Sequence, residues 1–199
     1  MIRWCSITGL IAVLLFCTAC SHQLVLHNTP VPIKQTAKLG TPASVFVDRV
    51  HVPFILQNQI GRKKNFAGDF LAWIKTDSDM AAWAENEINS FLKRHGHTIV
   101  SDLKKADYIL ICDVTDIKAE KRNRWDNNDT FNSTIELNMK IKKVREGITV
   151  FNRLYATSYN AVRMKEKEAA NPDEKMLNYC LSMVFQKALE QVRLDFSKK

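Results

Sequence analysis

Hydrophobic and polar positions divide the chain after residue 43 into strand-like and helix-like segments. Valines at 45, 47, 50 and 52 flank Asp48-Arg49 and predict a first strand that ends at Pro53. Residues 80–92 then place apolar side chains at helical spacing. Asp77 and Ser78 are candidate caps for this helix and Gly96 is its candidate stop, with a short strand expected at 98–100.

The second half of the chain predicts further strands and one more helix. Residues 108–112 are continuously apolar, which is typical of a strand covered on both faces. Residues 135–142 alternate between apolar and polar, which predicts a half-buried strand, and Glu146-Gly147 turns the chain into a partner strand at 148–161. Asn171 and Pro172 mark the start of an amphipathic helix.

Two segments have no clear periodicity. Residues 54–76 mix aromatic and basic side chains and predict either an irregular excursion or a short helix at 67–74. Residues 117–131 read as a polar, charged loop. The order of elements favours an α+β fold. We expect a two-layer sandwich, with a mostly antiparallel sheet and two long amphipathic helices on one face.

The amino-terminal segment has the pattern of an export signal. Arg3 precedes an apolar run at 7–17, which is too short to span a bilayer core of about 30 Å. Small residues then lead to Cys20, an arrangement that resembles the lipobox of bacterial lipoproteins. It predicts cleavage after residue 19 and acylation of Cys20. An ordinary cleaved secretory signal and a short uncleaved anchor are the alternatives.

The residues after Cys20 predict where the protein resides. Position 21 is Ser rather than Asp, which favours the outer membrane over retention at the inner membrane. Residues 20–43 contain three prolines and no periodicity, and so predict an extended tether. Residues 44–199 are expected to form one domain facing the periplasm. Two or more acyl chains hold a protein firmly at a bilayer.

Charge and cysteine content narrow the possible partners. The net charge of +8 suits anionic lipid headgroups or cell-wall polymers, although a merely soluble basic surface is an alternative. Nucleic acid is not expected as a partner, because an exported protein rarely meets it. Cys112 and Cys180 each lie in an apolar stretch, so two buried thiols and a disulfide both remain open.

Two basic-aromatic patches are candidates for contact with an envelope protein, an anionic lipid or a glycan. The first belongs to the 54–76 excursion and the second to the 117–131 loop. The alternatives are aromatic rings that fill the core beside solvated lysines, and a mobile solvated loop. The candidate residues are Arg62, Lys63, Lys64 and Trp73 in the first patch, and Arg122, Arg124 and Trp125 in the second.

Sequence motifs for catalysis are missing. The five histidines do not show metal-ligand spacing, and no nucleophile, phosphate-loop or metalloprotease motif occurs. Asp113, Asp116 and Glu120 are the carboxylates that a cell-wall hydrolase would use, but a solvated strand end explains them more simply. We therefore expect no enzyme activity, no metal and no cofactor.

A family resemblance rests on three segments together with Cys20. These are Val47-Asp48-Arg49, a helix ending in 93–96, and Ala106–Leu110 opening a strand. In this order they resemble YajG-type bacterial outer-membrane lipoproteins, and are similar to the auxiliary lipoproteins of ABC-type lipid transporters. The resemblance implies a non-enzymatic envelope lipoprotein with a binding or structural role. The alternative is an accessory subunit of an ABC-type lipid-transport or secretion complex.

Overall fold

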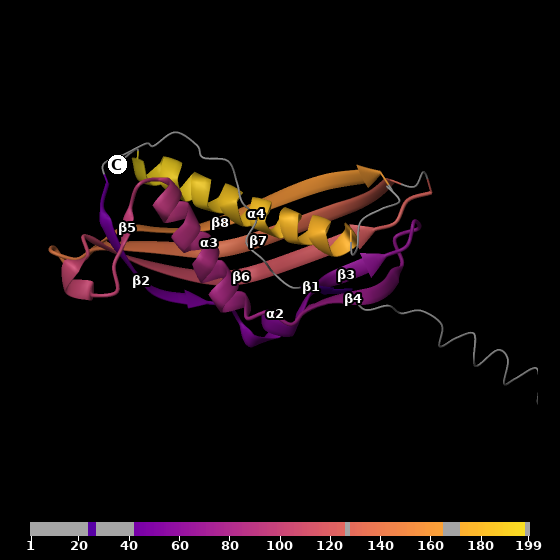
Figure 1. Ribbon diagram of the computed structural model, residues 1–199, viewed down its shortest axis with the longest axis horizontal. Coiled ribbons are helices and arrows are strands. Elements are labelled where there is room, and N and C mark those ends of the chain that lie inside the picture. The colour runs from indigo at the N-terminus through magenta and orange to yellow at the C-terminus, as the bar shows by residue number, and fades with distance from the viewer. Residues whose placement is uncertain (1–23, 27–41, 126–127, 165–171, 198–199) are drawn as a thin grey trace, which may run out of the picture.

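The fold is an eight-stranded mixed sheet with helices packed against it (Figure 1). It is a computed structural model that describes residues 24–26, 42–125, 128–164 and 172–197. The elements in chain order are β1 (Leu24–Leu26), β2 (Ser44–His51), α2 (Phe54–Asn58), β3 (Gln59–Lys64), β4 (Phe70–Thr76), α3 (Met80–Arg94), β5 (Thr98–Ile99), the 3-10 turn η1 (Leu103–Lys105), β6 (Tyr108–Arg122), β7 (Asn128–Lys143), β8 (Ile148–Met164) and α4 (Pro172–Ser197).

Strand β6 organises the sheet. Along one edge it pairs with β7, which pairs in turn with β8, and both pairings are antiparallel. Its other edge is divided between two strands that run parallel to it: β2 lies beside residues 108–113 and β3 beside residues 119–122. The sheet is completed by β4 and β1 next to β3 and by β5 next to β2.

The expectation of a mostly antiparallel sheet under two long helices is wrong. Four of the seven strand pairings described are parallel, and strands are the dominant element. One helix, α4 with 26 residues, is long in the described part of the chain, whereas α3 has 15. The periodicity of a strand shows which side chains it buries but not which distant strand it pairs with. The parallel neighbours of β6 were therefore hidden in the sequence.

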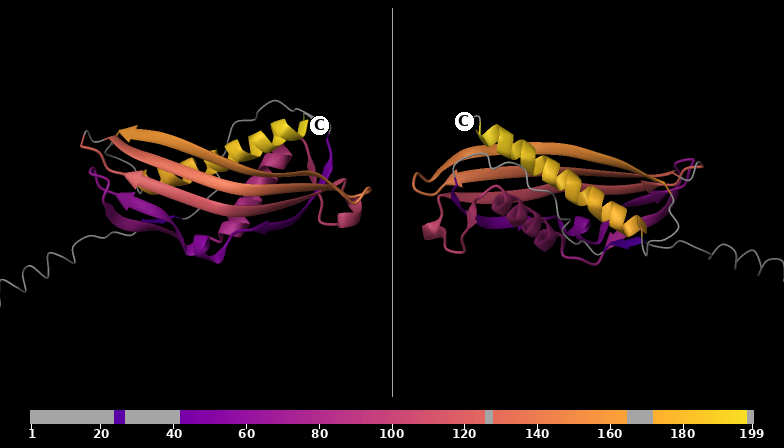
Figure 2. Two further views of the ribbon diagram at one scale, coloured as in Figure 1. Left: turned by 180° about the vertical axis from the view of Figure 1, so that it is seen from behind. Right: turned by 45° about the horizontal axis from the view of Figure 1, so that its top comes forward.

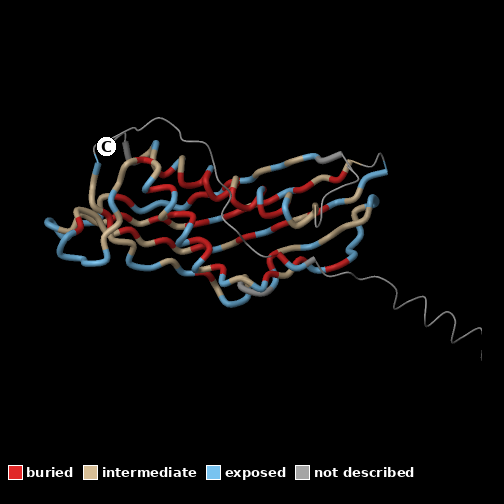
Figure 3. The backbone as a smooth tube through the Cα atoms, viewed as in Figure 1, coloured by how far each residue is buried: buried red, intermediate tan, exposed pale blue. Residues whose placement is uncertain are grey.

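Helix α4 lies across β7 and β8, and the core fills the space beneath it (Figures 2 and 3). Its start at Pro172 is as predicted. Helix α3 packs against α4 and β2. Its cap is Asp79, whose side chain accepts hydrogen bonds from the backbone of Ala81 and Ala82, and not Asp77 or Ser78. The predicted stop is confirmed, because Gly96 has the positive φ of 85° that a left-handed helix end requires.

The two unassigned segments are mainly strands. Residues 59–76 form the β3–β4 hairpin, whose turn is closed by backbone and side-chain hydrogen bonds between Asn65 and Asp69. The expected loop at 117–131 is instead the continuation of β6 and the start of β7. Its charges misled the prediction because one of them, Lys121, is buried between two aspartates, Asp129 and Asp173.

The two cysteines of the domain are free thiols. Cys112 on β6 and Cys180 on α4 are both buried. Burial raises the pKa of each thiol to about 12, and Asp113 adds to the effect at Cys112. They therefore behave as small apolar core residues. The helices that the structure describes include none with the length and apolar character of a membrane span.

Candidate functional site

The two basic-aromatic patches of the sequence meet at one end of the sheet. Parallel pairing of β3 with β6 places Arg62 beside Glu120 and Lys64 beside Arg122. The rings of Phe66 and Trp125 then come into contact, with centroids 3.7 Å apart. We call this surface the strand-end patch. Its members are Arg62, Lys64, Phe66, Phe70, Trp73, Arg122, Arg124 and Trp125.

Aromatic rings of the strand-end patch are exposed rather than part of the core. Trp125 is 79% exposed, and Phe66, Phe70 and Trp73 are each more than 40% exposed. Phe70 and Trp73 contact each other at 4.8 Å between centroids. Large rings left in water at one site mark a surface that contacts something apolar. The alternative in which these aromatics fill the core is therefore wrong.

The basic residues of the patch are not equivalent. Lys64 forms an ion pair with Glu120 at 2.6 Å, and Arg122 donates a hydrogen bond to the carbonyl of Phe66. Lys63 pairs in the sheet with Ala72 and Lys121, both buried, so strand alternation turns it to the opposite face from Arg62. The exposed cations beside the rings are Arg62, Arg122 and Arg124.

Strand β1 lies close to this patch. It runs parallel to β4, with Leu24 opposite Ile74 and Leu26 opposite Thr76. The Thr76 hydroxyl donates a hydrogen bond to the Leu26 carbonyl at 3.1 Å, and Leu26 is buried. Residues 24–26 thus belong to the sheet although they fall inside the expected tether. Cys20 itself lies outside the described residues.

The carboxylates considered for hydrolysis each have a cationic partner. Asp113 accepts from Arg49 at 3.1 Å, Asp116 pairs with Lys118, and Glu120 pairs with Lys64. The described ranges contain no group of three or more His, Cys, Asp or Glu side chains placed to hold a metal ion. Asp113 and Asp116 lie inside β6, and Glu120 is close to its end, so the expected solvated strand end does not describe the first two.

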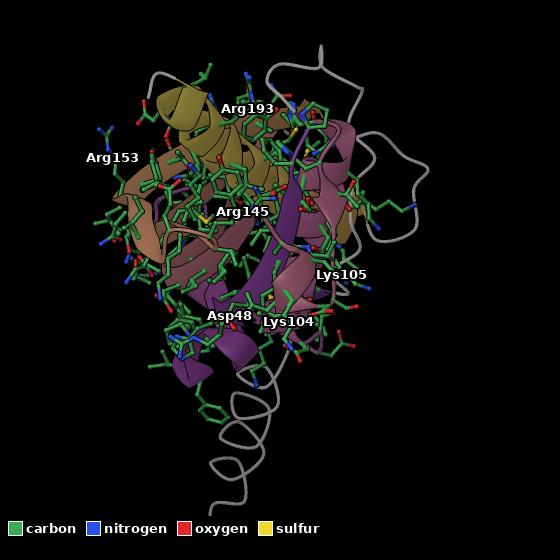
Figure 4. All side chains as sticks on the ribbon, turned by 90° about the vertical axis from the view of Figure 1, so that its left-hand side faces the viewer. Asp48, Lys104, Lys105, Arg145, Arg153 and Arg193 are labelled. Carbon is green, nitrogen blue, oxygen red and sulfur yellow. The ribbon has the colours of Figure 1, made fainter. Side chains whose placement is uncertain are left out.

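A cavity of about 520 Å³ lies at the other end of the sheet, between α3, α4 and the strands β2, β6 and β7. Its walls are mainly apolar. Polar and charged residues also line the cavity. Figure 4 views this end of the molecule and shows Arg193 on α4 above Arg145 in the β7–β8 turn. The apolar lining includes Val45, Ile88, Phe91, Leu110, Met139 and Leu189.

Sequence reasoning missed this cavity and the convergence of the two patches. The cavity lining comes from five elements and from the segments beside them, and within each element the apolar residues look like ordinary core. The patches were found one at a time, because the pairing of β3 with β6 joins residues about sixty positions apart. Local pattern contains no signal for either arrangement.

Comparison with known proteins finds similarity among solved structures. No family model matches the sequence, and no curated protein matches it. Among solved structures the chain is similar to protein XCC0632 from Xanthomonas campestris, with 16% identity, a TM-score of 0.47, and 84% of this chain and 86% of that one covered.

Two further similar structures are named lipoproteins. The minor lipoprotein from Acinetobacter baumannii has 10% identity and a TM-score of 0.38, over 71% of this chain and 92% of that one. Lipoprotein GNA1162 from Neisseria meningitidis has 10% identity and a TM-score of 0.36, over 76% of this chain and 99% of that one.

Proposed function

We propose that the chain is a non-enzymatic lipoprotein of the bacterial cell envelope. Acyl chains on Cys20 anchor it to the outer membrane, and residues 44–199, joined in the sheet by β1, form a domain in the periplasm. In this proposal the domain turns its strand-end patch toward the bilayer that holds the anchor. The anchor keeps the protein at the membrane and the patch sets its orientation there.

The position of β1 supports this orientation. Cys20 precedes Leu24 by four residues, which span at most about 14 Å when fully extended. Leu24 lies opposite Ile74, the neighbour of Trp73 in β4. Acyl chains attached to Cys20 therefore bring the membrane surface close to the strand-end patch, whatever path those four residues take.

The chemistry of the patch suits an anionic bilayer surface. Tryptophan rings are favoured at the boundary between headgroups and hydrocarbon, where their apolar and polar parts are both satisfied. Each arginine close to an anionic surface adds about 1 kcal/mol of attraction, and this attraction is screened by salt. Arg62 lies opposite Trp73 in the β3–β4 pairing, and the exposed Arg122 and Arg124 precede Trp125 in the chain.

Tryptophan fluorescence tests the orientation. After removal of the signal the chain keeps three tryptophans: Trp73 and Trp125 in the patch, and Trp83, which is buried on α3. We expect brominated acyl chains in phosphatidylglycerol-containing vesicles to quench Trp73 and Trp125 of the reconstituted acylated protein, and to spare Trp83. Trp73→Phe and Trp125→Phe assign the quenched emission. Emission that is insensitive to bromine in the anchored protein would refute the orientation.

The anchor is tested separately. Cys20→Ser removes the acceptor sulfur, so we expect the protein to leave the membrane fraction, and mass spectrometry of the wild-type amino end to show acylated Cys20. Ser21→Ala is the matched control, because it changes the neighbouring hydroxyl and keeps the thiol. A Cys20→Ser chain that stays in the membrane fraction contradicts the lipid anchor.

A second candidate function is an accessory subunit of an ABC-type lipid-transport or secretion complex. The edge strand β8 favours it, because residues 154–162 contain no charge and no proline and pair on one side only within the described chain. Such an edge accepts a strand from a partner. Crosslinking from Asn160, at the edge, in intact membranes should capture a permease or its ATPase. If neither the permease nor the ATPase is captured, this second candidate function is refuted.

A further inference from the structure

The cavity between α3, α4 and the sheet has the size and lining of a ligand site. A volume of about 520 Å³ lies within the usual range for small-molecule pockets, about 300–1,000 Å³. Phe91 and Ile88 line it from α3, and Leu189 and Val192 from α4. Leu110 and Met139 close it on the sheet side. An apolar chain placed here exchanges water for these walls.

Charged groups gather around the apolar lining. Lys143, Arg145 and Arg193 are the lining cations, and Asp107 is the lining carboxylate. Asp107 accepts hydrogen bonds from the backbone and the hydroxyl of Ser44, at 2.9 and 2.7 Å. These bonds, together with the charge of Arg145, lower the pKa of Asp107 and hold it as a carboxylate already supplied with donors.

The three cations differ in how far they are engaged. Lys143 pairs with Glu146 in the same turn, and Arg193 pairs with Glu190 one helical turn earlier. Neither glutamate lines the cavity. Arg145 is exposed and forms no ion pair with the residues that the structure describes. Its guanidinium is therefore available to an anionic group at the mouth of the cavity.

We propose that this cavity binds a single-chain amphiphile with an anionic head, such as a fatty acid or a lysophospholipid. The acyl chain lies between α3, α4 and the sheet, and the head lies against Arg145, with Lys143 and Arg193 on either side. The site is at the opposite end of the sheet from the strand-end patch. It therefore stands or falls independently of the anchor and of the orientation proposed above.

The chain's own segment 27–41 is a poorer occupant. It leads directly into Pro42 and Ala43, which line the cavity, and so is near enough to be considered. It carries Lys34 and Lys38 and no acidic residue, so it adds positive charge beside a basic rim. An amphiphile with an anionic head matches both the walls and the rim.

Photolabelling tests the proposal on the acylated, membrane-reconstituted chain. The probe is a palmitic acid with a diazirine near the end of its chain, and labelled peptides are identified by mass spectrometry. We expect labels on the cavity walls of α3 and α4, around Phe91 and Leu189. Unlabelled palmitic acid and lysophosphatidic acid, used as competitors, distinguish a carboxylate head from a phosphate head. The same diazirine on hexadecanol, which has no charge, should label these walls about tenfold less.

Two variants and a matched control sharpen the result. Ala43→Trp fills the cavity from its mouth and should abolish labelling of the walls. Arg145→Gln should lower palmitic acid labelling about tenfold without changing labelling by hexadecanol. Lys104→Gln removes an exposed cation at the same end that does not line the cavity, and should change nothing.

The outcomes separate cleanly. Equal labelling of the wild-type walls by palmitic acid and hexadecanol overturns the proposal that the ligand has an anionic head. This comparison uses the wild-type protein alone. Labels that avoid the walls, or that persist in a folded Ala43→Trp chain, overturn the site. Loss of membrane anchoring in Cys20→Ser, with wall labelling kept, leaves the site standing and removes the proposed anchor instead.

Discussion

The two ends of the sheet use the same kinds of side chain in opposite places. At the strand-end patch the aromatic rings lie outside and a charge lies inside: Trp125 is 79% exposed, whereas Lys121 is 5% exposed between Asp129 and Asp173. At the cavity end apolar side chains surround an interior space and the cations lie at its rim. One end is therefore closed and suited to contact with a surface, and the other is hollow and suited to a ligand.

The difference shows that the neighbouring elements decide which side chains are buried at each end. Lys121 is tolerated inside because two carboxylates meet its amine and the ring of Phe131 lies 5.8 Å away. The cavity lies where the carboxy-terminal halves of α3 and α4 face β2, β6 and β7.

Removing the buried charge should have the largest effect. Lys121→Ala leaves the buried Asp129 and the half-buried Asp173 without their shared cation, which costs about 3–5 kcal/mol of unfolding free energy. Lys118→Ala is the control, because Lys118 sits three residues earlier on β6, is 64% exposed in its side chain, and should cost at most about 1 kcal/mol. Denaturant unfolding measures both. Equal losses contradict the structural role of the buried pair.

Lys121 also shows why part of the fold escaped prediction. A lysine among Lys118, Glu120 and Arg122 reads as a solvated loop, and only Asp129 and Asp173, one of them fifty residues away, make it a strand residue. Where one face of an element is apolar, as on α3 or on residues 135–142, the sequence alone predicted the element and its buried face. The core pattern of single elements was predictable, and the pairing of distant ones was not.

The same limit applies to the candidate site. The seven candidate contact residues come from the sequence, and their contact with a partner stays a prediction. Strand pairing places Arg62, Trp73 and Arg122 on one face of the sheet and Lys63 on the other. What joined Trp73 to Trp125 was the parallel β3–β6 pairing, which depends on backbone groups and leaves no trace in side-chain order. The role of Cys20 remains a prediction, since it lies outside the described residues.

A smaller loss of unfolding free energy should follow from adding a side chain where β3 and β6 are in closest contact. A Cβ built on Gly61 would lie 1.7 Å from the Ala119 carbonyl oxygen, so Gly61→Ala must push the two strands apart. We expect a loss of about 1–3 kcal/mol. Hydrogen exchange should rise at residues 119–122 of β6 and stay unchanged at residues 108–113, which pair with β2. Exchange that rises equally along β6 would show that the two halves are not separate.

Acidity should weaken the cavity end first. Burial lowers the pKa of His95 and of His97 below 6.5; at His95 the Glu190 charge opposes this, while Arg193 and Arg94 add to it. The unfolded chain then binds protons that the folded one does not, so stability is full above about pH 6.5 and falls as pH drops below it. His97→Gln should flatten the fall between about pH 7.5 and about pH 5.5. An unchanged slope in His97→Gln contradicts this assignment.

The smallest change should be a gain. Val192 on α4 borders the cavity, and Val192→Ile extends one methylene into it, so burial there adds up to about 0.8 kcal/mol to the unfolding free energy. Gly61→Ala also adds one carbon, at the patch end, but there it should lower the unfolding free energy. One added carbon should thus stabilise the cavity end and destabilise the patch end. Thermal unfolding of delipidated protein measures the gain. If the gain disappears when palmitic acid is added, the methylene and the acyl chain compete for one space; if it is absent from the start, the walls have already closed on each other.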